Sequence, residues 1–158
     1  MPTQGRALDI ACGSGANALY LAERGLHVDA WDISDVVVSH LENRHPRLYP
    51  RALDITAAAI ENSRYDLILT CHYLDPSLAK AIVRATHPGG LIIYQTFTAG
   101  KKADIGPRNP DFLLKPGQLE SFVSGCRVLR FEDGTDIVDQ GNPMAGRAYI
   151  IAQKNIDQ

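Results

Sequence analysis

The sequence predicts an α/β fold with a mostly parallel β-sheet that carries helices on both faces. Short apolar stretches of strand length alternate with stretches of helical periodicity, which is the pattern of parallel strands joined by crossover helices. The last two strand-like stretches have no helical pattern between them, so we expect them to pair as an antiparallel hairpin at one edge of the sheet. Seven strands are expected, at residues 7–11, 26–31, 48–53, 65–71, 91–97, 127–132 and 148–153.

Capping residues, prolines and glycines place the helices between these strands. The segment after residue 53 has no clear helical pattern and is expected to be a polar, alanine-containing connector. Residues 98–115 form a long loop rich in Gly, Pro, Lys and Arg, and loops of this length are more often functional than passive. The expected helices follow the turn at residues 12–15, begin at Ser34 or Asp35, begin at Asp75, and run from Pro116 to Val123.

Length, composition and charge limit the classes of protein that this chain can belong to. The 158 residues are 45% hydrophobic and 22% charged, with a formal net charge of -2, and we expect a single soluble domain over residues 1–158. No apolar run is long enough to span a bilayer and the N-terminus has no signal-peptide core, so a cytoplasmic protein without a membrane partner is expected. The three cysteines form no C-x-x-C pair, which predicts neither disulfide nor metal. The near-neutral charge argues against nucleic acid as a partner.

The strongest motif is a glycine turn between the first strand and the first helix. Asp9 lies in the strand, and Gly13 and Gly15 follow in the turn. Glycines let the backbone approach a ligand closely, and the helix that begins there offers free N–H groups to a carboxylate or phosphate. Asp32 ends the second strand, where a carboxylate can accept both hydroxyl hydrogens of a ribose. Both features lie at the carboxyl ends of adjacent strands, so we expect a nucleoside-containing ligand there.

Two cofactor classes fit this motif. Gly13-x-Gly15-x-x-Ala18 with Asp32 also satisfies a permissive dinucleotide fingerprint, which would make the protein an NAD(P)-dependent reductase. Asp9 favours the other class, because a carboxylate at that position can meet the ammonium group of an amino-acid-bearing cofactor. A third interpretation is a non-catalytic cofactor-binding module that a partner or a dimer mate completes, so a homodimer is among the partners considered.

These residues resemble the class I S-adenosylmethionine-dependent methyltransferases, whose glycine motif reads acidic-x-Gly-x-Gly-x-Gly. Ala11 stands here in place of the first glycine. Within that superfamily, residues 7–13, 17–22 and 109–117 are most similar to the small tellurite-resistance and thiopurine type. The resemblance implies a Rossmann-like fold and S-adenosyl-L-methionine as the cofactor. Members of this group usually carry an N-terminal helix before the first strand, and only about six residues precede it here, so we expect the domain to lack that cap.

Carried over position by position, the resemblance implies a cofactor site. Asp9 lies near the amino group and the glycine turn lines the methionine part. Asp32 holds the ribose, Asp54 accepts from the adenine amine, and the end of the fourth strand lies beside the sulfonium. The cofactor-binding residues implied are Asp9, Ala11, Gly13, Gly15, Asp32, Ile33, Asp54, Ile55, Thr70 and Cys71.

Methyl transfer from a sulfonium is an in-line displacement in which positioning does most of the catalysis, so a small-molecule acceptor that is already a nucleophile needs little further help. Catalytic candidates follow the fourth strand: His72 can accept a proton, and Tyr73 can offer its ring to the sulfonium or its hydroxyl to the acceptor. Arg108 in the long loop can clamp an oxyanion. The simpler interpretation is that His72 and Tyr73 only pack under the following helix. The segment lacks the Asn/Asp-Pro-Pro-aromatic pattern of enzymes that methylate base amino groups.

Overall fold

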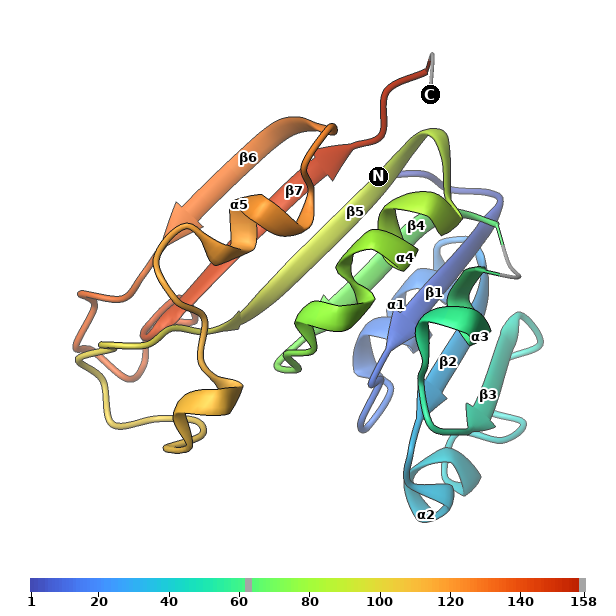
Figure 1. Ribbon diagram of the computed structural model, residues 1–158. Helices are drawn as coiled ribbons and strands as arrows, with labels where there is room; N and C mark the ends of the chain where they lie inside the picture. Colours follow the sequence, from blue (N-terminus) through green and yellow to red (C-terminus); the bar gives the residue numbers. More distant parts are fainter. Residues whose placement is uncertain (62–63, 157–158) are drawn as a thin grey trace.

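The computed structural model describes residues 1–61 and 64–156, and its strands form one sheet in the order β3-β2-β1-β4-β5-β7-β6 (Figure 1). The strands are β1 (Arg6–Ile10), β2 (His27–Asp32), β3 (Leu48–Ala52), β4 (Tyr65–Cys71), β5 (Thr86–Phe97), β6 (Arg127–Asp133) and β7 (Arg147–Gln153). β1 to β5 pair in parallel, whereas β7 is antiparallel to both β5 and β6. The predicted α/β class, with a seven-stranded Rossmann-like sheet and an antiparallel C-terminal hairpin, is confirmed.

The strand order changes direction at β1, because β2 and β3 extend the sheet on one side and β4 and β5 on the other. The connections leave the carboxyl ends of β1 and β4 in opposite directions, which opens a crevice between them. Figure 1 shows these ends of β1, β2 and β4 at the lower edge of the sheet, between α2 and the long loop. The topology therefore places the ligand site at this edge.

Helices cover the two faces of the sheet unequally. On one face α3, α4 and α5 pack through residues such as Ile60, Ile82 and Phe122. On the other face α1 packs through Leu21 onto β1, β2 and β4, and Leu41, just after α2, joins the same cluster. No described helix belongs to this second face over β5 and β7. The helices are α1 (Ala16–Glu23), α2 (Asp35–Ser39), α3 (Ala57–Glu61), α4 (Ala79–Ala85) and α5 (Gln118–Phe122), with 3-10 turns η1 (Pro76–Leu78) and η2 (Pro110–Phe112).

The longest described α-helix, α1, has 8 residues, and none of the described helices has the length and apolar character needed to cross a bilayer.

The turn between β1 and α1 depends on its glycines. Gly15 is the N-cap of α1 and has φ 74°, a left-handed conformation that L-residues rarely adopt. A Cβ atom at Gly15 would also run into the buried side chain of Leu41. The turn is joined to the second strand by the Cys12 N–H, which donates to the Trp31 carbonyl at 2.9 Å. Glycine at residue 15 thus allows the turn, α1 and the end of α2 to pack together.

Three sequence expectations need correction. The expected connector after residue 53 contains α3, whose Ile60 is fully buried, and the pattern was hidden because the helix is only 5 residues long. The fifth strand begins at Thr86, not residue 91, so the His-Pro-Gly-Gly segment belongs to β5 and only follows the helix end. The last helix is shorter than expected, spanning Gln118–Phe122.

Candidate active site

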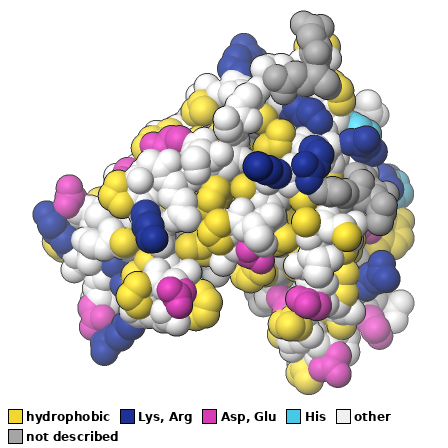
Figure 2. All heavy atoms as spheres, viewed as in Figure 1, with side chains coloured by type: hydrophobic (Ala, Val, Ile, Leu, Met, Phe, Trp, Pro, Cys, Tyr) yellow, Lys and Arg dark blue, Asp and Glu magenta, His cyan; other side chains and the backbone are white. Residues whose placement is uncertain are grey.

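A cavity of about 400 Å³ opens at the carboxyl ends of β1 and β4, where topology places a ligand. Figure 2 shows the molecule hollowed at its lower edge, between the long-loop region and α2. The wall comes from the end of β1, the glycine turn, the first turn of α1 and the end of β4. The lining residues are Asp9, Ala11, Cys12, Gly13, Ser14, Ala16, Asn17, Cys71 and His72.

Asp9 carries an unusual carboxyl group. Its side chain is 1% exposed, and its Oδ2 atom has no hydrogen-bond partner among the described residues. Burial raises the pKa of Asp9 to about 7; the Ala18 backbone N–H opposes this and the Asp32 charge adds to it. A buried, unpaired carboxyl oxygen that lines a cavity is suited to a cationic ligand group, which would supply both a hydrogen bond and an opposite charge.

Asp32 holds the glycine turn in place. Its Oδ2 accepts the Gly13 N–H at 2.9 Å and its Oδ1 accepts the Ser34 N–H at 3.0 Å. Each carboxylate oxygen can accept more than one hydrogen bond, so the group keeps capacity for ribose hydroxyls. Asp32 does not line the cavity itself. It lies at the end of β2, between the cavity and the surface beside that strand.

The residues around the cavity fit S-adenosylmethionine. Gly13 has φ 51°, and a Cβ atom built there meets nothing within 4 Å, so its backbone faces open space where a ligand can approach. Burial raises the pKa of the Cys12 thiol to about 12 and that of the Cys71 thiol to about 11. Both thiols are therefore neutral at pH 7 and can lie against a cofactor without attacking it. Asp9 supplies the carboxylate that an amino-acid moiety requires.

The residues predicted to hold the adenine are spread over a wider surface. Ile33 is 76% exposed just beyond β2, and Asp54 is exposed just beyond β3. Ile55 is instead packed into the core beside α3 and α4, and Thr70 is 1% exposed and does not line the cavity. Asp9, Ala11, Gly13 and Cys71 are thus brought together in one cavity, whereas the adenine contacts and Gly15 stay predictions.

His72 lies at the end of β4 in a strained conformation with φ 57°. The backbone N–H of His72 donates to the Gln95 carbonyl at 2.9 Å. The exposed imidazole ring stacks on Phe97 with a centroid distance of 5.2 Å. Partial burial and the Arg147 charge lower the pKa of His72. The imidazole is therefore neutral at pH 7 and able to accept a proton at the cavity wall.

The other two catalytic candidates lie elsewhere. Tyr73 packs against the core on the α4 side, and burial together with Asp75 and Asp54 raises the pKa of its phenol. Arg108 is exposed in the long loop, where its Nη2 pairs with Asp104 at 3.3 Å. Neither residue lines the cavity. Their catalytic roles stay predictions.

Sequence reasoning missed several residues of the site. Ser14, Ala16 and Asn17 line the cavity because α1 begins inside its wall, and their position next to the glycine motif is a signal that sequence alone provides. Arg147 carried no such signal, because it lies 75 residues beyond His72 in the chain and comes near it only through the pairing of β5 and β7.

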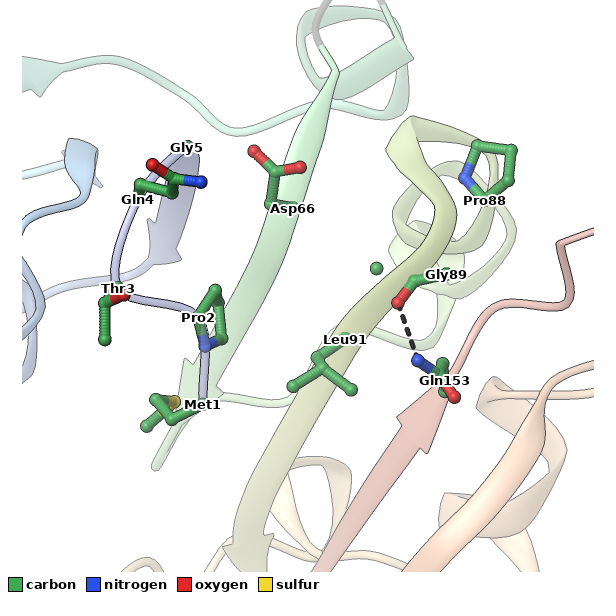
Figure 3. A pocket seen from close by; sticks show the side chains of 11 residues that line it. Met1, Pro2, Thr3, Gln4, Gly5, Asp66, Pro88, Gly89, Leu91 and Gln153 are labelled. Atoms are coloured by element: carbon green, nitrogen blue, oxygen red, sulfur yellow. Dashed lines mark hydrogen bonds between the residues drawn. The ribbon is translucent and has the colours of Figure 1, made fainter.

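A second, larger hollow of about 810 Å³ lies at the opposite end of the sheet, beside the N-terminus (Figure 3). Its charged wall residue, Asp66, already accepts the Arg6 N–H at 2.8 Å and faces His87 Nδ1 at 3.2 Å. The hollow adjoins the amino ends of β1 and β4, away from the glycine turn. We therefore assign the candidate site to the smaller cavity.

The fold and the cavity define a class of protein, and comparison with known proteins agrees. The chain belongs to the methyltransferase domain family, whose model matches residues 7–90, more than half of the chain. It is a class I S-adenosylmethionine-dependent methyltransferase. The matched segment contains Asp9, the glycine turn, Asp32 and His72, which favours this interpretation over a dinucleotide-dependent reductase.

Individual relatives belong to more than one kind of methyltransferase. The ubiquinone biosynthesis O-methyltransferase of Paracidovorax citrulli is 32% identical over 99% of this chain and 76% of its own length. The probable S-adenosyl-L-methionine-dependent methyltransferase TehB of Haemophilus influenzae is 30% identical over 81% of this chain, which spans 48% of that protein. The crystal structure of TehB from Haemophilus influenzae has the same fold, with a TM-score of 0.76 and 22% identity over 97% of this chain and 58% of that chain.

Proposed function

We propose that this methyltransferase transfers the methyl group to a small-molecule nucleophile in the cavity at the carboxyl ends of β1 and β4. The observation that carries the proposal is the buried Oδ2 atom of Asp9, which lines the cavity without a described partner. When bound, the cofactor supplies an electrophilic methyl group on a sulfonium, which an acceptor lone pair takes by in-line displacement.

Residues of the glycine turn would hold the cofactor. Asp9 in its ionised form would bind the ammonium group, while Gly13 lets the backbone approach the methionine part. Asp32, which already fixes the turn through the Gly13 N–H, would accept the ribose hydroxyls. Ile33 and Asp54 lie on the surface beyond β2 and β3, where an adenine ring would extend.

His72 is the residue of this chain that we assign to proton transfer. Its ring is held on Phe97 and its lowered pKa keeps it neutral, so a nitrogen lone pair is available for a proton that the acceptor loses. The acceptor nucleophile would then approach the methyl group between His72 and Cys71 at the cavity wall.

A small acceptor is supported by the near-neutral charge of the chain and by the size of the cavity. The named relatives are an O-methyltransferase of ubiquinone biosynthesis and TehB, so their names point to no common acceptor. Tellurite, selenite and small thiols are the first acceptors to assay, because each is a nucleophile that needs little activation.

Cofactor binding is tested by titrating the protein with S-adenosylhomocysteine in a calorimeter. We expect micromolar affinity, weakened at least about 100-fold in Asp32→Ala because turn anchoring and ribose contacts are both lost. Asp35→Ala, an exposed acid in α2, is the matched control and should bind as the wild type does. An absence of binding by the folded wild-type protein contradicts the proposal.

Proton transfer is tested with His72→Asn, because asparagine tolerates the left-handed backbone that histidine adopts here. We expect kcat to fall about 10²- to 10⁴-fold for a protonated acceptor, with the affinity for S-adenosylhomocysteine unchanged. The measurement is S-adenosylhomocysteine release as a function of acceptor concentration. An unchanged kcat would remove His72 from the mechanism.

A further inference from the structure

Arg147 lies on the same face of the sheet as the cofactor cavity. It begins β7 and pairs directly with Phe97, the last residue of β5. Cys71, which lines the cavity, pairs with Gln95 two residues before Phe97, and side chains two residues apart on a strand share a face. Arg147 and Phe97 therefore extend the wall of the cavity outward along the sheet.

The guanidinium group of Arg147 is only partly satisfied. Its Nη1 donates to the Pro143 carbonyl at 2.9 Å and to the Ala145 carbonyl at 3.4 Å, and its Cζ atom lies 4.7 Å from the centroid of the Phe97 ring. Its Nε atom is buried and has no hydrogen-bond partner among residues 1–61 and 64–156, nor does any carboxylate of those residues form an ion pair with it. A buried donor left unpaired destabilises the fold, more so on a charged group, so the unpaired Nε is unusual for a purely structural arginine.

The surroundings connect Arg147 to the site. The ring of His72 stacks on the same Phe97 ring that lies under the guanidinium. The long loop also reaches this ring, because a Cβ atom at Gly106 would come within 2.5 Å of Phe97. No described helix covers this face over β5 and β7, where Ile93 and Ile151 are half-exposed. This face is therefore partly open to solvent next to the proposed base.

We propose that Arg147 is the residue that selects the acceptor, by binding a negatively charged oxygen group of a small anionic molecule. The bound oxygen would supply the negative charge that no described carboxylate gives this guanidinium, while the nucleophilic atom of the same molecule points past Phe97 and His72 to the cavity. A guanidinium suits this role because its Nε and Nη groups form a planar fork for a carboxylate or oxyanion. The inference rests on the proposed function and adds the charge class of the acceptor to it.

The direct test follows the Nε–H signals of arginine by ¹⁵N NMR in the complex with S-adenosylhomocysteine, the Arg147 signal being assigned as the one absent from Arg147→Lys. We expect it to shift and saturate with 3-mercaptopropionate but not with its methyl ester, which lacks the charge. Tellurite in a separate titration distinguishes a general oxyanion site from one restricted to carboxylates. An Arg147 signal that neither anion moves at millimolar concentrations overturns the proposal.

Kinetics provide the second test, with S-adenosylhomocysteine release as the readout. The wild-type preference for 3-mercaptopropionate over its ester, as a ratio of kcat/KM, should fall at least about 10-fold in Arg147→Gln and less in Arg147→Lys, which keeps the charge. Arg127→Gln on the exposed edge strand β6 is the matched control and should keep the ratio. A purely structural role would lower stability and leave the ratio unchanged, which also overturns the proposal.

These outcomes are separable from failure of the proposed function. If the protein does not bind S-adenosylhomocysteine, the proposed function fails first. If it binds S-adenosylhomocysteine normally and the Arg147 signal ignores both anions, only the inference about the acceptor fails.

Discussion

Burial raises the pKa of Asp9 to about 7, because it removes water from the carboxyl group and no cation among the described residues compensates for that loss. A pKa raised from 3.8 to about 7 means that folding favours the protonated form. Between those values the unfolded state loses the proton first, so this group makes the free protein less stable as pH rises towards about 7. A cationic ligand reverses this preference, because it needs the ionised form.

The affinity for S-adenosylhomocysteine should therefore depend on pH. Below the Asp9 pKa of about 7, the ligand can bind only after the carboxyl group loses its proton, which weakens binding. Kd should therefore fall by up to about tenfold per pH unit as pH rises, and become constant above the pKa. Calorimetry from about pH 6 to about pH 8 measures this slope. Asp9→Asn should bind more weakly and show no such slope; a wild-type Kd that is flat over this range would contradict the role of Asp9.

Ala11 occupies a position where glycine is the better residue. Its φ of 54° is a left-handed conformation that costs a non-glycine residue about 1–2 kcal/mol, while glycine costs about 0.5–1 kcal/mol more than alanine in the entropy of the unfolded chain. Ala11→Gly should thus raise the free energy of unfolding by about 0.5–1 kcal/mol, measured in urea. Ala16→Gly, in the ordinary helical conformation of α1, should lower it. Equal destabilisation by both changes would show that Ala11 is unstrained.

At the scale of elements, β7 has two different faces. Ile150 is fully buried against the α5 side, whereas its neighbour Ile151 points to the face that no described helix covers and is half-exposed. The hydrophobic contribution of each side chain follows the surface that it removes from water. Truncating Ile150 therefore measures packing on the covered face of β7, and truncating Ile151 measures packing on the open face.

We expect Ile150→Ala to lower the free energy of unfolding by about 2–5 kcal/mol and Ile151→Ala by about 1 kcal/mol. Urea denaturation of the two variants measures the difference, and the shared side chain makes each the control for the other. Equal losses would mean that the open face is covered in solution, which contradicts the space that we assign to the acceptor.

The elements also differ in how well the sequence predicts them. β4 was predicted correctly because a continuous apolar run is typical of a strand buried on both faces. α3 was missed because five residues contain too few positions to establish a helical period, and its stability comes from packing Ile60 into the core. β5 begins earlier than predicted because Thr86 pairs with Tyr65 of β4, while His-Pro-Gly-Gly forms the irregularity between this pair and the pairing of Leu91 with Leu67.

At the scale of the whole molecule, the site lies where two layers of helices leave the sheet partly open. α1 covers β1 and β4 beside the cavity, and the covering stops short of β5 and β7. The long loop is fastened at both ends, since Leu114 N–H donates to the Phe97 carbonyl and Ala99 N–H to the Leu114 carbonyl. The loop is thus anchored at the end of β5 and touches Phe97 through Gly106. That residues 1–158 form one domain stays a prediction.

The sequence by itself predicted the α/β class and the antiparallel hairpin, because strand periodicity is a local property of the chain. Its motifs and the family resemblance pointed to Asp9, Ala11, Gly13, Cys71 and His72, which line one cavity. Only the tertiary structure decided that Ile55 packs in the core, that Tyr73 and Arg108 lie outside the cavity, and that Arg147 approaches His72. The physical reason is that burial, pKa and unpaired hydrogen-bonding groups depend on which distant strands pair and in which register. Those pairings are a property of the whole sheet, and no short segment of the sequence encodes them.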